Sequence, residues 1–313
     1  MTLQSTTSNL EKQIKRQKHE HPQPKFLLQD YLLLLKPRVM SLVVFTGVVG
    51  LLLSPHTVDL KTAFVAITCI ALGAGASGAI NMWYDKDIDH VMTRTMNRPI
   101  PAGRMSPNGA LFFGTSLAFL SVGIMGFWVN IEAATLLAIT ILYYVFVYTM
   151  WLKRRTPQNI VIGGAAGAFP PMIGWVAASG DIGLGSIVLF GIIFLWTPPH
   201  SWALALFRRS DYEAAGIPML PVVAGETETK RQMCVYTLLL IPTTLMPAFL
   251  GMSGMLYTAA AIVLGVEFGR RTWVLWRDTG IFGAKPLFFY SILYLFLIFA
   301  MLIIDKAFFF PFL

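Results

Sequence analysis

Long apolar segments alternate with short polar segments along most of the chain. A mostly apolar segment of about 20 residues is long enough to cross the roughly 30 Å hydrocarbon core of a bilayer as a helix. We expect such segments at residues 39–56, 60–82, 108–128, 131–151, 159–178, 183–206, 233–253, 255–275 and 286–305. The pattern therefore predicts an all-α protein, a polytopic membrane helical bundle with about nine transmembrane helices.

The N-terminal region differs from the rest because it mixes basic and acidic side chains and has no long apolar run. It lacks the apolar core of a cleaved secretory signal and the acid-poor character of an organellar transit peptide. We predict a disordered cytoplasmic tail over residues 1–30 and a membrane domain over residues 31–313. Cys69 and Cys234 fall in or beside expected spans, so a disulfide framework is not indicated.

Composition supports a membrane protein, since 56% of residues are hydrophobic and 13% are charged, against roughly 25% charged in soluble domains. The net charge of +8 would suggest a nucleic-acid partner in a soluble protein. If the loops alternate between two sides of a membrane, however, all Lys and Arg residues except Lys61 and Lys306 fall on one side. This asymmetry indicates the cytoplasmic side, places the N-terminus there, and argues against a nucleic-acid partner.

The two long polar loops, 83–107 and 207–232, each follow the second helix of an expected four-helix set. This arrangement predicts two four-helix halves and one further helix at the C-terminal end. A site at the interface between the halves is typical of such internal duplications.

The end of the second expected span carries candidate metal ligands. Residues four apart on a helix differ by about 40° in direction, so Asn81, Asp85 and Asp89 share one face, while Asp87 points elsewhere. Oxygen side chains stacked at a membrane boundary repel one another unless a cation lies between them, and Mg²⁺ suits carboxylates with open coordination positions. The alternative is an acidic, solvated helix end.

The following loop adds guanidinium groups, since Arg94, Arg98 and Arg104 come after the acidic stripe. Arginine favours charge-assisted bidentate contacts with phosphate oxygens. Carboxylates and arginines together predict a diphosphate site. In the second long loop, Asp211 or Glu213 could complete a metal site from the opposite half, and the alternative there is an ordinary juxtamembrane surface.

The acidic stripe and its trailing arginines look like the first aspartate-rich motif of the UbiA superfamily of intramembrane prenyltransferases, and within it the haem-farnesylating branch. The resemblance covers about residues 30 to 305. It also rests on the segments Leu35 to Arg38, Lys153 to Pro171, Trp196 to Trp202 and Asp211 to Pro221. The wider superfamily usually has a second aspartate four residues after Asp211, where this chain has Ala215. The departure resembles the haem branch and leaves the ligands of a second metal open.

The resemblance implies a UbiA-like fold, farnesyl diphosphate and haem b as substrates, and Mg²⁺ as cofactor. It also implies a place in the bacterial cytoplasmic (inner) membrane, in contact with the lipid bilayer and with a downstream haem-modifying membrane enzyme. The catalytic residues it implies are Asp85, Asp89, Arg94, Arg98, Lys153 and Asp211. The substrate-binding residues it implies are Asn81, Arg38, Arg104, Arg154, Asn159, His200, Arg208 and Tyr212. The metal ligands it implies are Asn81, Asp85, Asp89 and Asp211.

His200 is the only histidine in an expected span, and two prolines precede it. The haem hypothesis makes it a candidate axial ligand for iron, and the alternative is a packed histidine bonded to a neighbouring group. An allylic cation would also need electron-rich walls. We expect two or three aromatic side chains to line the cavity, from the set Tyr143, Tyr144, Phe146, Tyr148, Phe194 and Trp196.

Two other functions share some of these features. Prenylation of an aromatic or quinone precursor would use the same acidic stripe but gives no reason for His200. A polytopic ion-coupled transporter typically has its ion site near the bilayer midplane. Here only Glu267 lies well inside an expected span, while the other acidic groups cluster at the cytoplasmic edge, which favours an enzyme acting on a charged head group.

Overall fold

The computed structural model describes residues 28–308, which form helices and loops without a strand, so the all-α prediction is confirmed. The first helices are α2 (Leu28–Leu34), α3 (Pro37–Leu53), α4 (Leu60–Tyr84), α5 (Lys86–Val91), α6 (Pro107–Trp128), α7 (Ile131–Leu142) and the π-helix η1 (Tyr143–Leu152). The later helices are α8 (Asn159–Gly163), α9 (Ala165–Ser179), α10 (Leu184–Phe207), α11 (Arg209–Ala214), α12 (Leu220–Val223), α13 (Gly225–Phe249), α14 (Met255–Arg277) and α15 (Ala284–Phe308). The expected tail lies outside the described residues up to residue 27, and residues 28–30 begin α2.

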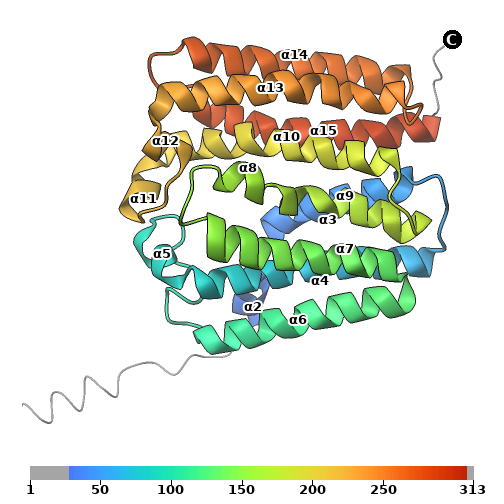
Figure 1. Ribbon diagram of the computed structural model, residues 1–313, viewed down its shortest axis with the longest axis horizontal. Helices are drawn as coiled ribbons and strands as arrows, with labels where there is room; N and C mark the ends of the chain where they lie inside the picture. The colour runs from blue at the N-terminus through green and yellow to red at the C-terminus, as the bar shows by residue number, and fades with distance from the viewer. Residues whose placement is uncertain (1–27, 309–313) are drawn as a thin grey trace, which may run out of the picture.

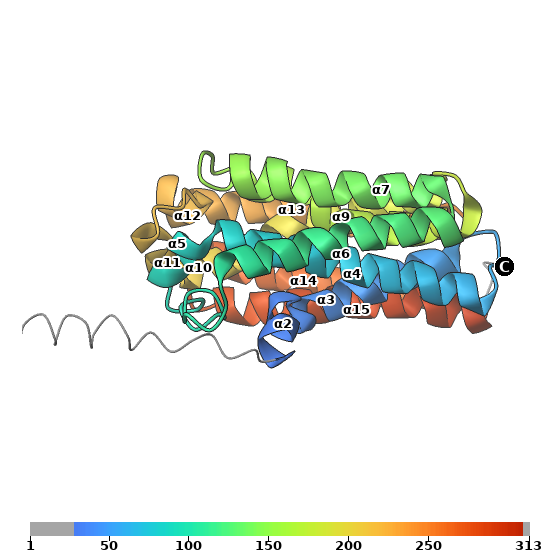
Figure 2. The ribbon, with the colours of Figure 1, turned by 90° about the horizontal axis from the view of Figure 1, so that it is seen from below.

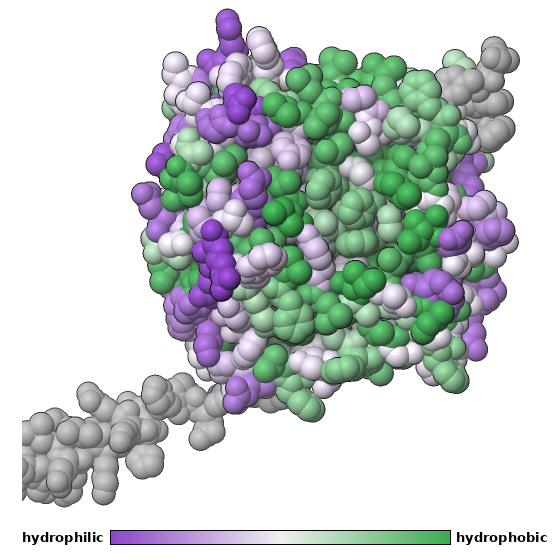
Figure 3. Space-filling view, in the orientation of Figure 1, coloured by the Kyte–Doolittle hydropathy of each residue, from purple (hydrophilic) through white to green (hydrophobic). Residues whose placement is uncertain are grey.

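The long helices lie side by side in one bundle, with the short helices α5, α11 and α12 together at one end (Figures 1 and 2). Figure 3 shows a broad apolar band on one face between two more hydrophilic ends. The end that carries the short helices also carries the two long polar loops. This distribution fits a bundle that crosses a membrane along its helices.

The number of membrane-spanning helices differs from the expected nine. Among the described residues, seven helices are long and apolar enough to cross a bilayer, and the pair α2 and α3, bent by 54°, would make eight. The expected span 255–275 is helical, as part of α14, but it carries Glu267, Arg270 and Arg271, which lower its hydropathy. The exact count of nine is therefore not confirmed.

Local side chains set where several spans begin and end. Asp59 precedes α4, and its carboxylate accepts hydrogen bonds from the backbone N–H groups of Lys61 and Thr62 at 2.9 and 3.0 Å. The side chain of Asn130 caps α7 in the same way. Such caps satisfy the free N–H groups of a first helical turn. Gly180 ends α9 with a φ of 74°, a backbone conformation that glycine adopts without strain.

The helices group as two sets joined through α3 and α9. Helices α3, α4, α6 and α7 pack together in the first half, α9, α10, α13 and α14 in the second, and α15 packs against α3, α10 and α14. A side chain added at Gly50 of α3 would overlap the carbonyl oxygen of Pro171 in α9, and one added at Gly174 would overlap that of Gly47. Small residues at these positions let the two backbones approach closely.

We expect Gly50→Ala to destabilise the bundle, because the added methyl group must push α3 and α9 apart. Overpacking of this kind costs about 1–3 kcal/mol, and thermal unfolding in detergent should show it as a lower midpoint. Gly123→Ala in α6 is the matched control, since nothing lies within 4 Å of a Cβ there. Equal midpoints for the two variants would contradict the close contact.

Candidate functional site

The junction between α4 and α5 presents the acidic stripe. Asp85 separates the two helices, yet backbone hydrogen bonds from Asp85 to Asn81 and from Asp89 to Asp85, at 2.9 and 2.8 Å, continue the helical spacing. Asn81, Asp85 and Asp89 are 4%, 0% and 2% exposed. The side chain of Asp87 is 60% exposed. The prediction that the first three share a face and Asp87 does not is confirmed.

The Asp85 carboxylate is enclosed by three polar groups. One oxygen, Oδ2, accepts a hydrogen bond from Asn81 Nδ2 at 2.7 Å and contacts the Lys153 ammonium group. The other oxygen, Oδ1, lies 3.6 Å from an Arg154 nitrogen and has no hydrogen-bond partner. A buried oxygen without a partner is unusual in a folded protein. This oxygen of Asp85 is therefore open to a further hydrogen-bond donor or cation.

Asp89 lies one turn further along and pairs with Arg98. The two side chains are 2.7 Å apart, with 3% of the Asp89 side chain and 21% of the Arg98 side chain exposed. Both line the same cavity. A carboxylate and a guanidinium group therefore lie together in the wall of one cavity.

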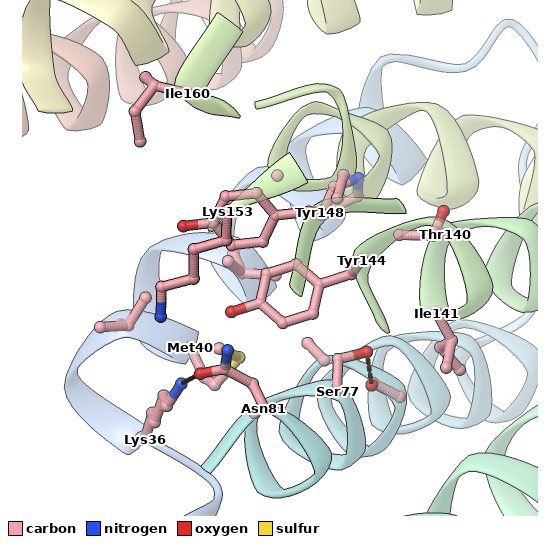
Figure 4. Close-up of a pocket in the computed structure, with 18 of the residues that line it drawn as sticks. Lys36, Met40, Ser77, Asn81, Thr140, Ile141, Tyr144, Tyr148, Lys153 and Ile160 are labelled. Atoms are coloured by element: carbon pink, nitrogen blue, oxygen red, sulfur yellow. Dashed lines mark hydrogen bonds between the residues drawn. The ribbon is translucent and has the colours of Figure 1, made fainter. Parts of the chain in front are cut away.

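Lys36 belongs to the site, although the sequence analysis did not select it. It lies at the bend between α2 and α3 with a φ of 52°, and no other non-glycine residue between 28 and 308 has a positive φ. Its ammonium group donates a hydrogen bond to Asn81 Oδ1 at 2.8 Å (Figure 4). The one local signal is Pro37, which indicates that a helix begins directly after Lys36.

The π-helix η1 turns Lys153 toward the site. In an α-helix, Tyr144 and Lys153 would lie on roughly opposite faces at about 100° per residue. The wider turn of a π-helix has a five-residue spacing, shown by the 2.9 Å hydrogen bond from Lys153 N to Tyr148 O. Tyr144, Tyr148 and Lys153 therefore point into the same space (Figure 4). The apolar pattern over residues 131–151 predicts an ordinary α-helical span, and the π-helix is a difference from that expectation.

These groups surround a cavity of about 340 Å³. Its polar end is lined by Lys36, Asn81, Asp89, Arg94, Arg98, Lys153, Asn159 and Tyr212. Its apolar walls come from α3, α4, α7 and α9 and include Val43, Ile70, Gly73, Leu137, Ile141, Gly167 and Ile173. Four cationic side chains and one carboxylate line the polar end, which favours an anionic ligand. Val39 lines the cavity and is 60% exposed, so the space reaches the outer surface of α3.

The structure brings part of the predicted set to this cavity. The predicted residues that line it are Asn81, Asp89, Arg94, Arg98, Lys153, Asn159 and Tyr212. Asp85 does not line the cavity itself, but its carboxylate contacts the Asn81 and Lys153 side chains, which do. Of the six aromatic candidates, Tyr144 and Tyr148 line the cavity, within the expected number of two or three.

Four of the arginines predicted to bind the substrate, Arg38, Arg104, Arg154 and Arg208, do not line the cavity. Arg38 is exposed on the first turn of α3. Arg104 pairs with the buried Asp30 of α2 at 2.9 Å. Arg154 pairs with Asp87 at 2.7 Å, and its hydrogen bonds hold the pKa of Asp87 below the ordinary value. The last two contacts tie the polar segments at this end of the bundle to one another.

The second long loop reaches the first one through Asp211. Its carboxylate accepts hydrogen bonds from Thr93 Oγ1 at 2.8 and 3.0 Å, and Arg208 lies 3.9 Å away. Asp211 does not line the cavity, and residues 28–308 contain no cluster of three or more acidic, His or Cys side chains suited to a metal. Its neighbour Tyr212 does line the cavity, and burial raises the pKa of its phenol, against the nearby charge of Arg94.

His200 lies away from the cavity. Its Nδ1 is 2.7 Å from Ser291 Oγ, and its ring stacks between Trp196 and Phe288, with centroids 4.2 and 4.7 Å away. None of these four residues lines the cavity. The contacts match the alternative of a packed histidine, and iron ligation by His200 stays a prediction.

Comparisons with known proteins show the family to which the chain belongs. Residues 43–293 match the UbiA prenyltransferase family. The chain is 58% identical to protoheme IX farnesyltransferase of Parvibaculum lavamentivorans, over 89% of each chain. It is 57% identical to protoheme IX farnesyltransferase of Acidiphilium cryptum, over 88% of this chain and 90% of the relative.

Solved structures show the same fold at low identity. A structure of digeranylgeranylglyceryl phosphate synthase matches with a TM-score of 0.75 and 19% identity, over 89% of this chain and 98% of the other. A UbiA homolog from Archaeoglobus fulgidus, bound to DMAPP and Mg²⁺, matches with a TM-score of 0.64 and 16% identity, over 87% and 99%. The predicted UbiA-like fold is confirmed.

We expect Asp85→Asn to lower turnover by roughly 100-fold or more, the usual effect of removing an essential electrostatic contact. Because Asp85 is buried and paired with Lys153, detergent thermal unfolding should accompany the rate measurement to separate misfolding from lost chemistry. Asp87→Asn is the matched control, since that exposed side chain points off the shared face. If Asp87→Asn lowered turnover as much as Asp85→Asn, the assignment of a functional role to the shared face would be wrong.

Proposed function

This chain belongs to the UbiA prenyltransferase family, and we propose that it transfers the farnesyl group of farnesyl diphosphate to a vinyl group of protohaem IX, giving haem O. The observation that carries the proposal is one cavity with a cationic end and long apolar walls. Such a space fits a substrate with a charged head and a hydrocarbon tail. The acceptor is supported by the relatives named protoheme IX farnesyltransferase.

The diphosphate would bind at the cationic end. Lys36, Arg94, Arg98 and Lys153 all line it. Arg94 has no carboxylate partner among residues 28–308; it interacts with the Tyr212 side chain, which also lines the cavity, and we propose that its guanidinium group binds phosphate oxygens. Cations held in a low-dielectric site stabilise the negative charge that develops on departing pyrophosphate.

The residues present fit a bound Mg²⁺ ion. Asn81 and Asp89 line the cavity, and Asp85 has a buried oxygen without a hydrogen-bond partner. Mg²⁺ commonly uses one or two carboxylates and takes other ligands from substrate phosphates. When bound, the ion would neutralise charge on the diphosphate. We propose Asn81, Asp85 and Asp89 as its ligands.

The apolar walls would hold the farnesyl chain and keep water from the reacting carbon. Ile70, Leu137 and Ile141 line this part, while Tyr144 and Tyr148 line the boundary with the polar end. Aromatic faces attract a cation. Exclusion of water strengthens each electrostatic contact and protects a reactive intermediate from hydrolysis.

The proposed reaction balances with one water molecule. The C–O bond to the diphosphate breaks, pyrophosphate leaves with the electron pair, and the terminal vinyl carbon bonds to the farnesyl carbon. Water then bonds to the inner vinyl carbon and releases a proton, which gives a hydroxyethylfarnesyl group. We propose that the product passes to a downstream haem-modifying membrane enzyme.

We expect purified protein to convert haem b to a farnesylated, hydrated product when supplied with farnesyl diphosphate and Mg²⁺. Product mass after chromatography is the measurement, and removal of Mg²⁺ with a chelator should reduce turnover to background. A second reaction contains an aromatic quinone precursor instead of haem b as the acceptor. If that precursor is farnesylated and haem b in the first reaction is not, the quinone-precursor alternative replaces the proposal.

The charge asymmetry of the loops supports a place in the bacterial inner membrane with the N-terminus in the cytoplasm. Labelling of single cysteines in a cysteine-free background tests this orientation. We expect Met96→Cys, at an exposed position of the first long loop, to react only from the cytoplasm. His56→Cys, in the exposed loop between α3 and α4, should react only from the opposite side. A reversed pattern would place the site on the other face.

A further inference from the structure

Two lysines occupy the oxygens that the proposed metal ion would need. Lys36 Nζ donates a hydrogen bond to Asn81 Oδ1 at 2.8 Å, and the Lys153 ammonium group contacts Asp85 Oδ2. They come from different parts of the chain, the bend before α3 and the end of η1. Figure 4 shows both side chains reaching toward Asn81. Two ammonium groups therefore lie where a divalent cation would bind.

The lysines are held in place by unusual backbone conformations. Lys36 has a positive φ, which is strained for a residue with a side chain, and Lys153 follows a π-helix. Strain of about 1–3 kcal/mol and π-helical turns both concentrate at functional sites. An ordinary surface lysine would require neither conformation. These backbone conformations bring the two ammonium groups into contact with Asn81 and Asp85.

The charges around the stripe disfavour a metal ion that arrives alone. Lys36, Arg94, Arg98 and Lys153 line the cavity, while the nearby carboxylates are those of Asp85 and Asp89. Arg94, Arg98 and Lys153 alone outnumber the two carboxylates, so positive charge is in excess, and it repels Mg²⁺ and attracts a diphosphate. Only part of the ligand set is open, because Asn81 Oδ1 and one oxygen of Asp85 already have ammonium partners.

We propose that Lys36 and Lys153 act as placeholders that couple metal binding to diphosphate binding. In the free protein Lys36 donates a hydrogen bond to the amide oxygen of Asn81, and Lys153 neutralises the carboxylate of Asp85. When a diphosphate binds, both ammonium groups move to its oxygens and free the ligands for the divalent cation. The inference rests on the proposed function and deepens it, since it makes Lys36 a diphosphate-binding residue and sets the order in which the site fills.

Placeholder lysines predict opposite changes in metal affinity and diphosphate affinity when they are removed, which a purely structural role would not produce. Removing either ammonium group should strengthen binding of the metal alone, because a competing cation is gone. The same change should weaken binding of the diphosphate alone, because a ligand is lost. A lysine that only stabilised the fold would weaken both, and coupling between two ligands is typically 5- to 150-fold.

The test measures two separate affinities in detergent, without haem. Mn²⁺ replaces Mg²⁺ and is followed by electron paramagnetic resonance, while inorganic pyrophosphate binding is measured by calorimetry in the presence of a chelator. We expect Lys36→Met and Lys153→Met each to bind Mn²⁺ roughly tenfold more tightly than the unaltered protein and pyrophosphate roughly tenfold more weakly. If Lys153→Met does not fold, Lys153→Gln replaces it, because glutamine keeps a hydrogen-bond donor to the buried Asp85.

Lys86→Met is the matched control, because Lys86 is an exposed lysine of α5 close to the same stripe. We expect it to change neither affinity by more than about twofold, as a screened surface charge should. The proposal is overturned if Lys36→Met and Lys153→Met leave Mn²⁺ affinity unchanged or lower, or if Lys86→Met raises it equally. Failure to farnesylate haem would overturn the proposed function instead, since neither affinity depends on haem.

Discussion

The buried carboxylate of Asp85 is the constraint on which the rest of the site depends. A charge removed from water costs several kcal/mol unless a partner of opposite charge compensates it. Lys153 supplies that charge and Asn81 adds a hydrogen bond. Because Asp85 follows α4 and Lys153 follows η1, their contact holds together the ends of two helices that are distant in the chain.

The Asp85–Lys153 contact lies beside a cavity that has a polar end and apolar walls. The close approach of α3 and α9 at Gly50 and Gly174 brings two of its apolar walls together. At the polar end, the bend before α3 adds Lys36 to the charges on α4 and η1. Charges beside an apolar space interact more strongly than in water, which favours binding of an anionic group at this end of the cavity.

Much of the site was predictable from local spacing. Asn81, Asp85 and Asp89 follow one another along one helical direction, and their burial and the exposure of Asp87 follow from that spacing. Asp89 and Arg98 are also close in the chain, so their pairing needed only the turn after α5. Long-range pairs were less predictable: Asp211 pairs with Thr93, and His200 packs against Ser291.

The sequence by itself determined an all-helical membrane bundle, its charge asymmetry and the face that carries the carboxylates, because these depend on composition and on about 100° per residue. Only the tertiary structure decided that Lys36 joins the site, that η1 is a π-helix which turns Lys153 inward, and that His200 lies elsewhere. The physical reason is that each of these depends on how helices distant in the chain pack against one another, which local periodicity does not encode.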